Sequence, residues 1–170
     1  MMSMVPDLLT LSRGIIAGVI AILGFAGPQA LEGVILLLML GWTTDILDGR
    51  IARRCRKEAT WIGDREFIFD MLLVFGSLCY LVLAGFVPSV PALIYVITGA
   101  LVIVYCRSKV VTMLFAFPLV VLPFIVAYDK APLEAWIYAI WALLAILFAR
   151  RRFKGIIIEF IANAKDLLKG

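Results

Sequence analysis

The sequence predicts an all-α membrane protein with six transmembrane helices, both termini cytoplasmic and a short C-terminal amphipathic helix. Hydrophobic residues make up 64% of the 170 residues and the mean hydropathy is +1.08, a composition typical of helical membrane proteins rather than soluble enzymes. Six apolar segments approach the roughly 17–25 residues that cross a bilayer. No internal repeat or composition break is visible, so residues 1–170 are expected to form a single domain and an inverted-repeat transporter is not favoured.

The first two predicted spans are separated by the breaker pair Gly27-Pro28, which indicates a short extracellular turn. Arg13 lies about one turn inside the first span, so this segment can cross the membrane only if the side chain extends to the interface. A basic linker follows the second span. The two segments are Leu8–Ala26 and Ala30–Asp48.

The other four spans alternate between proline-rich turns and basic connections. Proline occurs in the stretches 88–91 and 129–132, which predicts two further extracellular turns. The last stretch, Phe153 to Leu168, mixes apolar and charged residues as an amphipathic helix on the inner leaflet would, although an ordinary surface helix would show the same pattern. The four spans are Phe67–Val87, Val90–Cys106, Val110–Ala127 and Leu133–Ala149.

The distribution of basic residues supports this count of spans. With six spans, fifteen of the sixteen Lys and Arg residues fall on one side, and only Lys130 falls on the other. Cytoplasmic loops carry the excess of Lys and Arg in membrane proteins. Both termini are therefore predicted to face the cytoplasm, in a multi-pass protein of the cell (inner) membrane.

Two acidic pairs flank the basic linker. Asp45 and Asp48 are spaced i, i+3 near the end of the second span, and Glu66 and Asp70 are spaced i, i+4 at the start of the third, so each pair lies on one helix face. A carboxylate costs about 2.5–3.5 kcal/mol at the centre of a spanning helix. Four converging carboxylates need a cation, and hard oxygen ligands suit Mg²⁺ or Mn²⁺, with two ions able to promote displacement at phosphorus.

The neighbouring residues favour an anionic ligand beside these acids. Gly49 and Ala52 continue the face of the first acidic pair without bulk, and Arg53 lies at its edge. In a simpler alternative, Asp48 or Glu66 forms interfacial salt bridges with linker arginines. The chain has no His, and its three Cys residues lack metal-site spacing, so acid–base chemistry must use carboxylates, Lys, Tyr or Cys.

The run from Asp45 to Arg53, DILDGRIAR, resembles the first half of the signature of CDP-alcohol phosphatidyltransferases, D-x2-D-G-x2-A-R. Counted from Asp48, the third and fourth acidic positions of the signature fall on Glu66 and Asp70, with Glu where the family usually has Asp. Gly63 stands one position later than the family glycine.

The N-terminal sequence extends the likeness. Residues 9–13, LTLSR, are similar to the start of phosphatidylglycerolphosphate synthases. The resemblance implies transfer of a phosphatidyl-type group from a CDP-linked lipid to a small alcohol, phosphorylated or not, with release of CMP, in phospholipid biosynthesis. It also implies membrane lipids as partners and a homodimer. No nucleic-acid partner is expected.

The resemblance assigns roles to the site residues. Asp45, Asp48, Glu66 and Asp70 would hold the two Mg²⁺ or Mn²⁺ ions, and Asp70 would also be the catalytic general base. The CDP pocket would be lined by Gly49, Ala52 and Arg53.

Basic residues on the same predicted membrane face offer a place for the acceptor. Arg107 and Lys109, and the cluster Arg150–Arg152, are candidates to bind a phosphate on that alcohol. All of them would equally arise from the ordinary excess of positive charge on the inner side.

Two other functions fit part of the pattern. A cation transporter or channel would use buried acids as its pathway, but would distribute them through several spans. A non-catalytic relative would bind CDP-lipid without turning it over. The residues leave open the acceptor alcohol and whether the donor lipid is diacyl or ether-linked.

Overall fold

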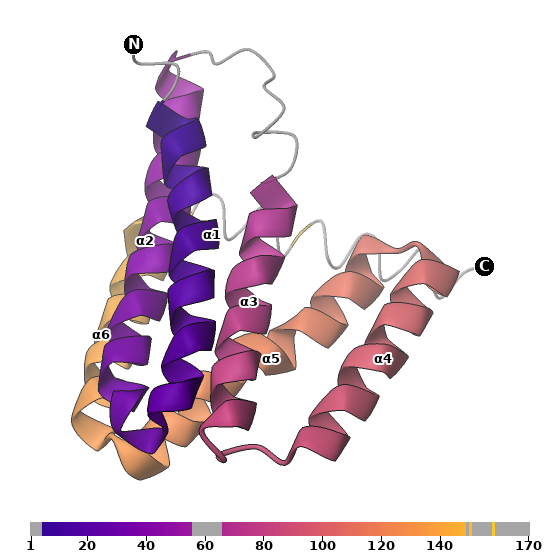
Figure 1. Cartoon of the computed structure of the whole chain (residues 1–170). Helices are drawn as coiled ribbons and strands as arrows, with labels where there is room; N and C mark the ends of the chain where they lie inside the picture. Colours follow the sequence, from indigo (N-terminus) through magenta and orange to yellow (C-terminus); the bar gives the residue numbers. More distant parts are fainter. Residues whose placement is uncertain (1–4, 56–65, 149, 151–157, 159–170) are drawn as a thin grey trace.

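The structure is a computed structural model that describes residues 5–55, 66–148, 150 and 158. This part of the chain contains six long α-helices joined by short connections, and no strand (Figure 1). Two short 3-10 helices, η2 and η3, form the first turn. The helices are α1 (Val5–Leu23), α2 (Leu31–Cys55), α3 (Glu66–Leu83), α4 (Ser89–Cys106), α5 (Lys109–Lys130) and α6 (Pro132–Phe148), with η2 at Gly24–Ala26 and η3 at Pro28–Ala30.

The six predicted helices are confirmed, and the main difference is the length of α2. The predicted span ended at Asp48, whereas the helix continues to Cys55. The reason is that charge ends the apolar segment without ending the helix, since Arg and Ala are good helix formers. The predicted C-terminal amphipathic helix lies outside the described residues, apart from Ile158.

Four helical stretches are long and apolar enough to cross a membrane, which makes this a multi-pass membrane protein by composition and length. The two remaining apolar helices, Phe67–Leu83 and Pro132–Phe148, are shorter, and their spanning role stays a prediction. The four long stretches are Asp7–Ala26, Pro28–Ile51, Ser89–Cys106 and Val110–Lys130.

Helix α1 packs against both α2 and α3 and lies between them in Figure 1. Ile16, Ala17 and Ile20 of α1 are buried together with Leu73 of α3. At Gly76 the two backbones approach so closely that a Cβ atom would lie 2.6 Å from the carbonyl oxygen of Ala17. Glycine at this position therefore fixes how near α3 comes to α1.

The predicted turn at Gly27-Pro28 is confirmed and is tied to α3. Gly27 has φ of 80°, a left-handed conformation that favours glycine. Its carbonyl oxygen accepts a hydrogen bond from the hydroxyl of Tyr80 at 3.3 Å. The end of the bundle opposite the acidic residues is thus held by both backbone and side-chain contacts.

Helices α4 and α5 form the other side of the molecule. In Figure 1 the α4–α5 connection lies at the outer edge of the bundle, and α3 lies between it and α1. Helix α6 packs on α2, where Trp141 Nε1 donates a hydrogen bond to Thr43 Oγ1 at 3.1 Å.

Candidate functional site

The side chain of Arg13 lies at the centre of a polar cluster formed by the first three helices. It is fully buried, at 0% exposure. Its Nη1 donates to Asp45 Oδ1 at 2.9 Å and also to Asp70 Oδ1, while Nη2 donates to Asp48 Oδ2. One guanidinium from α1 therefore brings together three of the four predicted acidic residues, two from α2 and one from α3.

This arrangement overturns the expectation that Arg13 extends to the membrane interface. The side chain instead turns inward, because three carboxylates provide charged hydrogen-bond partners that offset its desolvation. The sequence contained a signal for this contact: four predicted buried acids needed a cation, and Arg13 was the one basic residue inside a span. Asp48 therefore pairs with Arg13 of α1 and not, as the simpler alternative had it, with an arginine of the linker.

Thr10 completes the cluster, a position that sequence reasoning noted only as part of a resemblance. It lies one turn before Arg13 on α1 and is 3% exposed. Its Oγ1 donates to Asp48 Oδ2 at 3.1 Å and accepts from Arg13 Nη2 at 3.2 Å. We call Thr10, Arg13, Asp45, Asp48 and Asp70 the Arg13 cluster.

The three carboxyl groups of the Arg13 cluster differ in exposure. All three contact the guanidinium of Arg13. The Asp48 side chain is 4% exposed, whereas those of Asp45 and Asp70 are 15% and 22% exposed. A soluble cation or the hydroxyl of a substrate would thus meet Asp45 and Asp70 first.

The chemistry of these donors fits a hard divalent cation. Carboxylate oxygens are the ligands that Mg²⁺ and Mn²⁺ prefer, and Asp48 Oδ1 is buried without a hydrogen-bond partner in the described part of the chain. Among the described residues no three acidic, Cys or His side chains are grouped as a ready metal site, since Arg13 lies between the acids. Glu66 begins α3 one turn before Asp70, and only its backbone is described.

The remaining predicted site residues are distributed over two regions. Gly49 follows Asp48 on α2 and is half-buried; Ala52 and Arg53 continue the same helix, with only their backbone described. Arg107 is exposed at the end of α4 in a left-handed conformation, with φ of 46°, and Lys109 begins α5. The α4–α5 connection lies on the other side of α3 from α1 (Figure 1).

Arg50 shows that basic residues near the linker also have structural contacts. Its Nη2 donates to the carbonyl oxygen of Phe148 at 2.6 Å, and its guanidinium lies 5.6 Å from the centre of the Phe148 ring. The carbonyl belongs to the last turn of α6, where cations stabilise a helix end. Arg50 thereby joins α2 to α6 at the end of the bundle that carries the acids.

Comparison with known families follows this geometry. A family model described as CDP-alcohol phosphatidyltransferase matches residues 3–164. The chain belongs to the CDP-alcohol phosphatidyltransferase family. No curated protein and no solved structure matches it. The resemblance predicted from DILDGRIAR is thus confirmed at the level of the family, and membership implies transfer of a phosphatidyl group from a CDP-alcohol to an alcohol.

Proposed function

We propose that this CDP-alcohol phosphatidyltransferase uses divalent cations to transfer a phosphatidyl-type group from a CDP-linked lipid to a small alcohol, releasing CMP. The observation that carries the proposal is the meeting of Asp45, Asp48 and Asp70 in one cluster on adjacent helices. These are three of the four acidic positions of the family signature, in a chain that the family model covers almost entirely. A phosphatidylglycerolphosphate synthase-like reaction, with a phosphorylated acceptor, is the first version to test.

The acidic residues would hold two ions, Mg²⁺ or Mn²⁺. Asp45, Asp48, Glu66 and Asp70 are the proposed ligands, and the bound ions would neutralise the donor diphosphate and the charge that develops on the leaving CMP. Because Arg13 contacts the same carboxylates, its guanidinium must lose some of these contacts when a cation binds. When no metal is bound, Arg13 acts as the counter-ion that keeps the acidic side chains close together.

Asp70 is the proposed general base. Its side chain is the most exposed of the three acids in contact with Arg13, so an acceptor hydroxyl can reach it. Asp70 would accept the hydroxyl proton as the acceptor oxygen forms a bond to the lipid-linked phosphorus. The bond from that phosphorus to the bridging oxygen breaks, and the oxygen leaves with CMP.

The same face of α2 would bind the CDP group. Gly49 and Ala52 have small side chains that allow close approach, and Arg53 supplies a positive charge near the diphosphate. The continuous helix to Cys55 supports this proposal because it keeps these positions in register with Asp45 and Asp48. Arg107 and Lys109 could serve the acceptor only if the α4–α5 connection moves toward the Arg13 cluster.

We place this site at the cytoplasmic face of the cell membrane. The Arg13 cluster lies at the end of the bundle from which α2 runs into the basic linker, and such linkers remain in the cytoplasm. The lipid donor would approach from the inner leaflet with its chains in hydrocarbon. A homodimer is part of the proposal, since the family resemblance implies it.

The direct test is release of CMP by the purified protein in lipid nanodiscs. Labelled CDP-linked lipid, diacyl or ether-linked, is supplied with Mg²⁺ or Mn²⁺ and with glycerol 3-phosphate, inositol phosphate, serine or phosphatidylglycerol as acceptor. CMP should appear only when cation, donor and one matching acceptor are present together. Absence of CMP with every acceptor and both cations, while the protein remains folded, would reject the proposed activity.

A further inference from the structure

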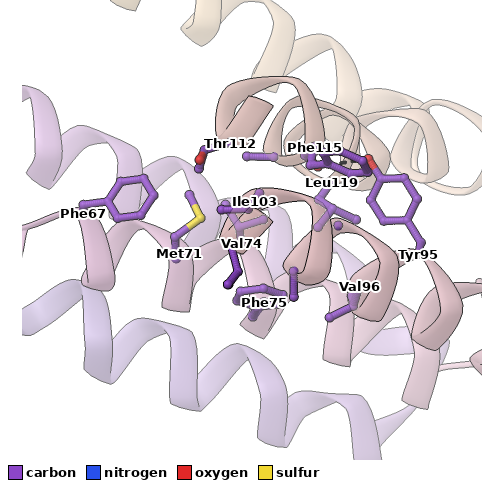
Figure 2. A pocket seen from close by; sticks show the side chains of 14 residues that line it. Phe67, Met71, Val74, Phe75, Tyr95, Val96, Ile103, Thr112, Phe115 and Leu119 are labelled. Carbon is purple, nitrogen blue, oxygen red and sulfur yellow. Dashed lines mark hydrogen bonds between the residues drawn. The ribbon is translucent and has the colours of Figure 1, made fainter. Parts of the chain in front are cut away.

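A long apolar cavity lies between α3, α4 and α5. It has a volume of about 270 Å³ and is lined by fourteen residues (Figure 2). Its walls include Phe67 and Met71 of α3, Ala100 of α4 and Ala116 of α5. Figure 2 shows Phe67 at one end and Tyr95 at the other, so the cavity is elongated along the helices. We call it the α3–α5 groove.

The described side chains that line the α3–α5 groove offer no free polar group to a ligand. Two of them carry hydroxyls, and both hydroxyls are used within the protein. Tyr95 donates to the carbonyl oxygen of Phe115 at 3.0 Å, and Thr112 donates to that of Ser108 at 3.1 Å. A polar ligand would lose its hydrogen bonds to water without replacement. The groove therefore suits a hydrocarbon chain.

One part of the groove wall is formed by α3 residues that follow two proposed site residues in the sequence. Phe67 and Met71 directly follow Glu66 and Asp70 in sequence. With about 100° between successive residues of a helix, Asp70 lies roughly 40° from the lining residue Val74 around the α3 axis. A ligand whose head contacts Asp70 can thus extend its tail along the adjacent face of α3.

The dimensions of the groove fit one chain of a lipid in a single leaflet. From Phe67 to Phe75 the wall extends about 12 Å along α3, at 1.5 Å per residue. This is close to half of the roughly 30 Å hydrocarbon thickness of a bilayer. The volume of about 270 Å³ is large enough for a segment of a hydrocarbon chain.

We propose that the α3–α5 groove holds one acyl or alkyl chain of the CDP-linked donor while the diphosphate lies at the Arg13 cluster. This inference rests on the proposed function. Bilayer hydrocarbon is as apolar as the groove wall, so the chain gains little from leaving the lipid. Binding of the chain instead orients the donor, because a fixed tail places the phosphorus against the acidic residues.

Photo-crosslinking tests the inference directly. A CDP-linked lipid that carries a diazirine midway along one chain is added to the full-length protein in nanodiscs with Mn²⁺, irradiated, and mapped by mass spectrometry. Labelling should concentrate on groove residues such as Met71, Ala100 and Ala116. Unlabelled CDP-lipid should compete severalfold better than phosphatidylcholine with the same chains. Labelling outside the groove would overturn the inference. Equal competition by both lipids would also overturn it, since it would mean that the groove holds any bilayer lipid.

Variants that fill the groove provide the matched control. Ala100→Phe and Ala116→Phe should each reduce groove labelling at least severalfold, whereas Thr98→Phe, an exposed α4 position outside the lining, should leave it unchanged. Unchanged labelling in both filling variants would overturn the inference. If a second copy of the chain filled the groove instead, the wild-type dimer would give no donor labelling there, and this result too would overturn it.

Calorimetry with CDP and Mn²⁺ on the same protein separates the two proposals. If CDP binds but the labelling lies outside the groove, only the proposed chain site is contradicted. No binding of CDP contradicts the proposed function and, with it, the chain site.

Discussion

Nη1 of Arg13 on α1 lies 2.9 Å from Oδ1 of Asp45 on α2, and the arginine side chain is entirely buried. This contact changes the composition of the candidate site. The acidic positions of the family signature lie on α2 and α3, but a buried positive charge that contacts three of them comes from the first helix. Activity and stability are therefore expected to depend on α1 as much as on the signature residues.

Replacement of Arg13 should destabilise the protein without metal and increase its response to metal. In Arg13→Gln the acids lose their counter-ion, and breaking a buried ion pair typically costs about 3–5 kcal/mol. We expect a lower Tm in EDTA and a larger rise on addition of Mn²⁺ than in the wild type. Thermal unfolding in detergent measures both values.

Lys130→Gln is the control for this prediction, because Lys130 forms an exposed pair with Asp129. Its Tm and its response to Mn²⁺ should equal those of the wild type. If Arg13→Gln behaved in the same way as Lys130→Gln, the counter-ion role of Arg13 would be wrong.

Asp70→Asn should remove turnover and preserve nucleotide binding. The amide keeps the shape of the side chain but cannot accept a proton, and loss of a general base typically lowers the rate about 10²–10⁴-fold. CMP release measures turnover, and calorimetry with CDP and Mn²⁺ measures binding. Asp129→Asn, in an exposed turn, is the control with unchanged turnover. Activity near the wild-type level in Asp70→Asn would exclude Asp70 as the base.

Removal of the cation should abolish both activity and CDP binding. EDTA should stop CMP release, and Mg²⁺ or Mn²⁺ should restore it.

The role of Glu66 as a metal ligand is tested by a pair of variants. Glu66→Asp keeps a hard carboxylate at the position and should retain cation-dependent activity, whereas Glu66→Gln should require a higher cation concentration. Equal cation dependence in both variants would remove Glu66 from the ligand set.

Gly76→Ala should disturb the site from a distance. The added Cβ would meet the Ala17 carbonyl oxygen at 2.6 Å, which must push α3 away from α1. Overpacking of this kind costs about 1–3 kcal/mol, and Asp70 moves with α3 relative to Arg13. We expect a lower Tm and slower CMP release.

Gly18→Ala is the matched control for Gly76→Ala, since a Cβ atom at this exposed α1 position meets nothing within 4 Å. It should keep or raise stability, because Ala is the better helix former. Equal stability of the two alanine variants would contradict the close packing described at Gly76.

The helices were predictable because hydropathy and breaker residues mark them directly. All six were located, and the turns at Gly27 and before Pro132 fall where proline and glycine indicated. The turn between α3 and α4 comes earlier than the predicted stretch 88–91, because α3 ends at Leu83 and α4 already begins at Ser89. The end of α2 was not predictable from hydropathy, since residues 49–55 contain three arginines but are still helical. Hydropathy marks where the apolar segment ends, but the helix can continue beyond that point, as α2 does.

The acidic half of the site was predictable, whereas for its basic half the sequence showed only that Arg13 is a basic residue inside a predicted span. Sequence spacing alone places Asp45 and Asp48 on one face of α2, and it places Asp70 near the start of the next helix. The position of Arg13 depends on which side of α1 faces α2 and α3, which is a tertiary property. The same limit applies to Arg107, whose predicted membrane side says nothing about its distance from the acids.

The inward-turned arginine also has a consequence for biosynthesis. Asp70 lies fifty-seven residues after Arg13 in the sequence, so α1 and α2 leave the ribosome before the third carboxylate of the Arg13 cluster does. Until Asp70 follows, Arg13 can pair only with the two carboxylates of α2. Insertion of the third helix should then lock the hairpin in place, and nascent chains truncated before residue 70 should be the ones that quality-control proteases remove fastest.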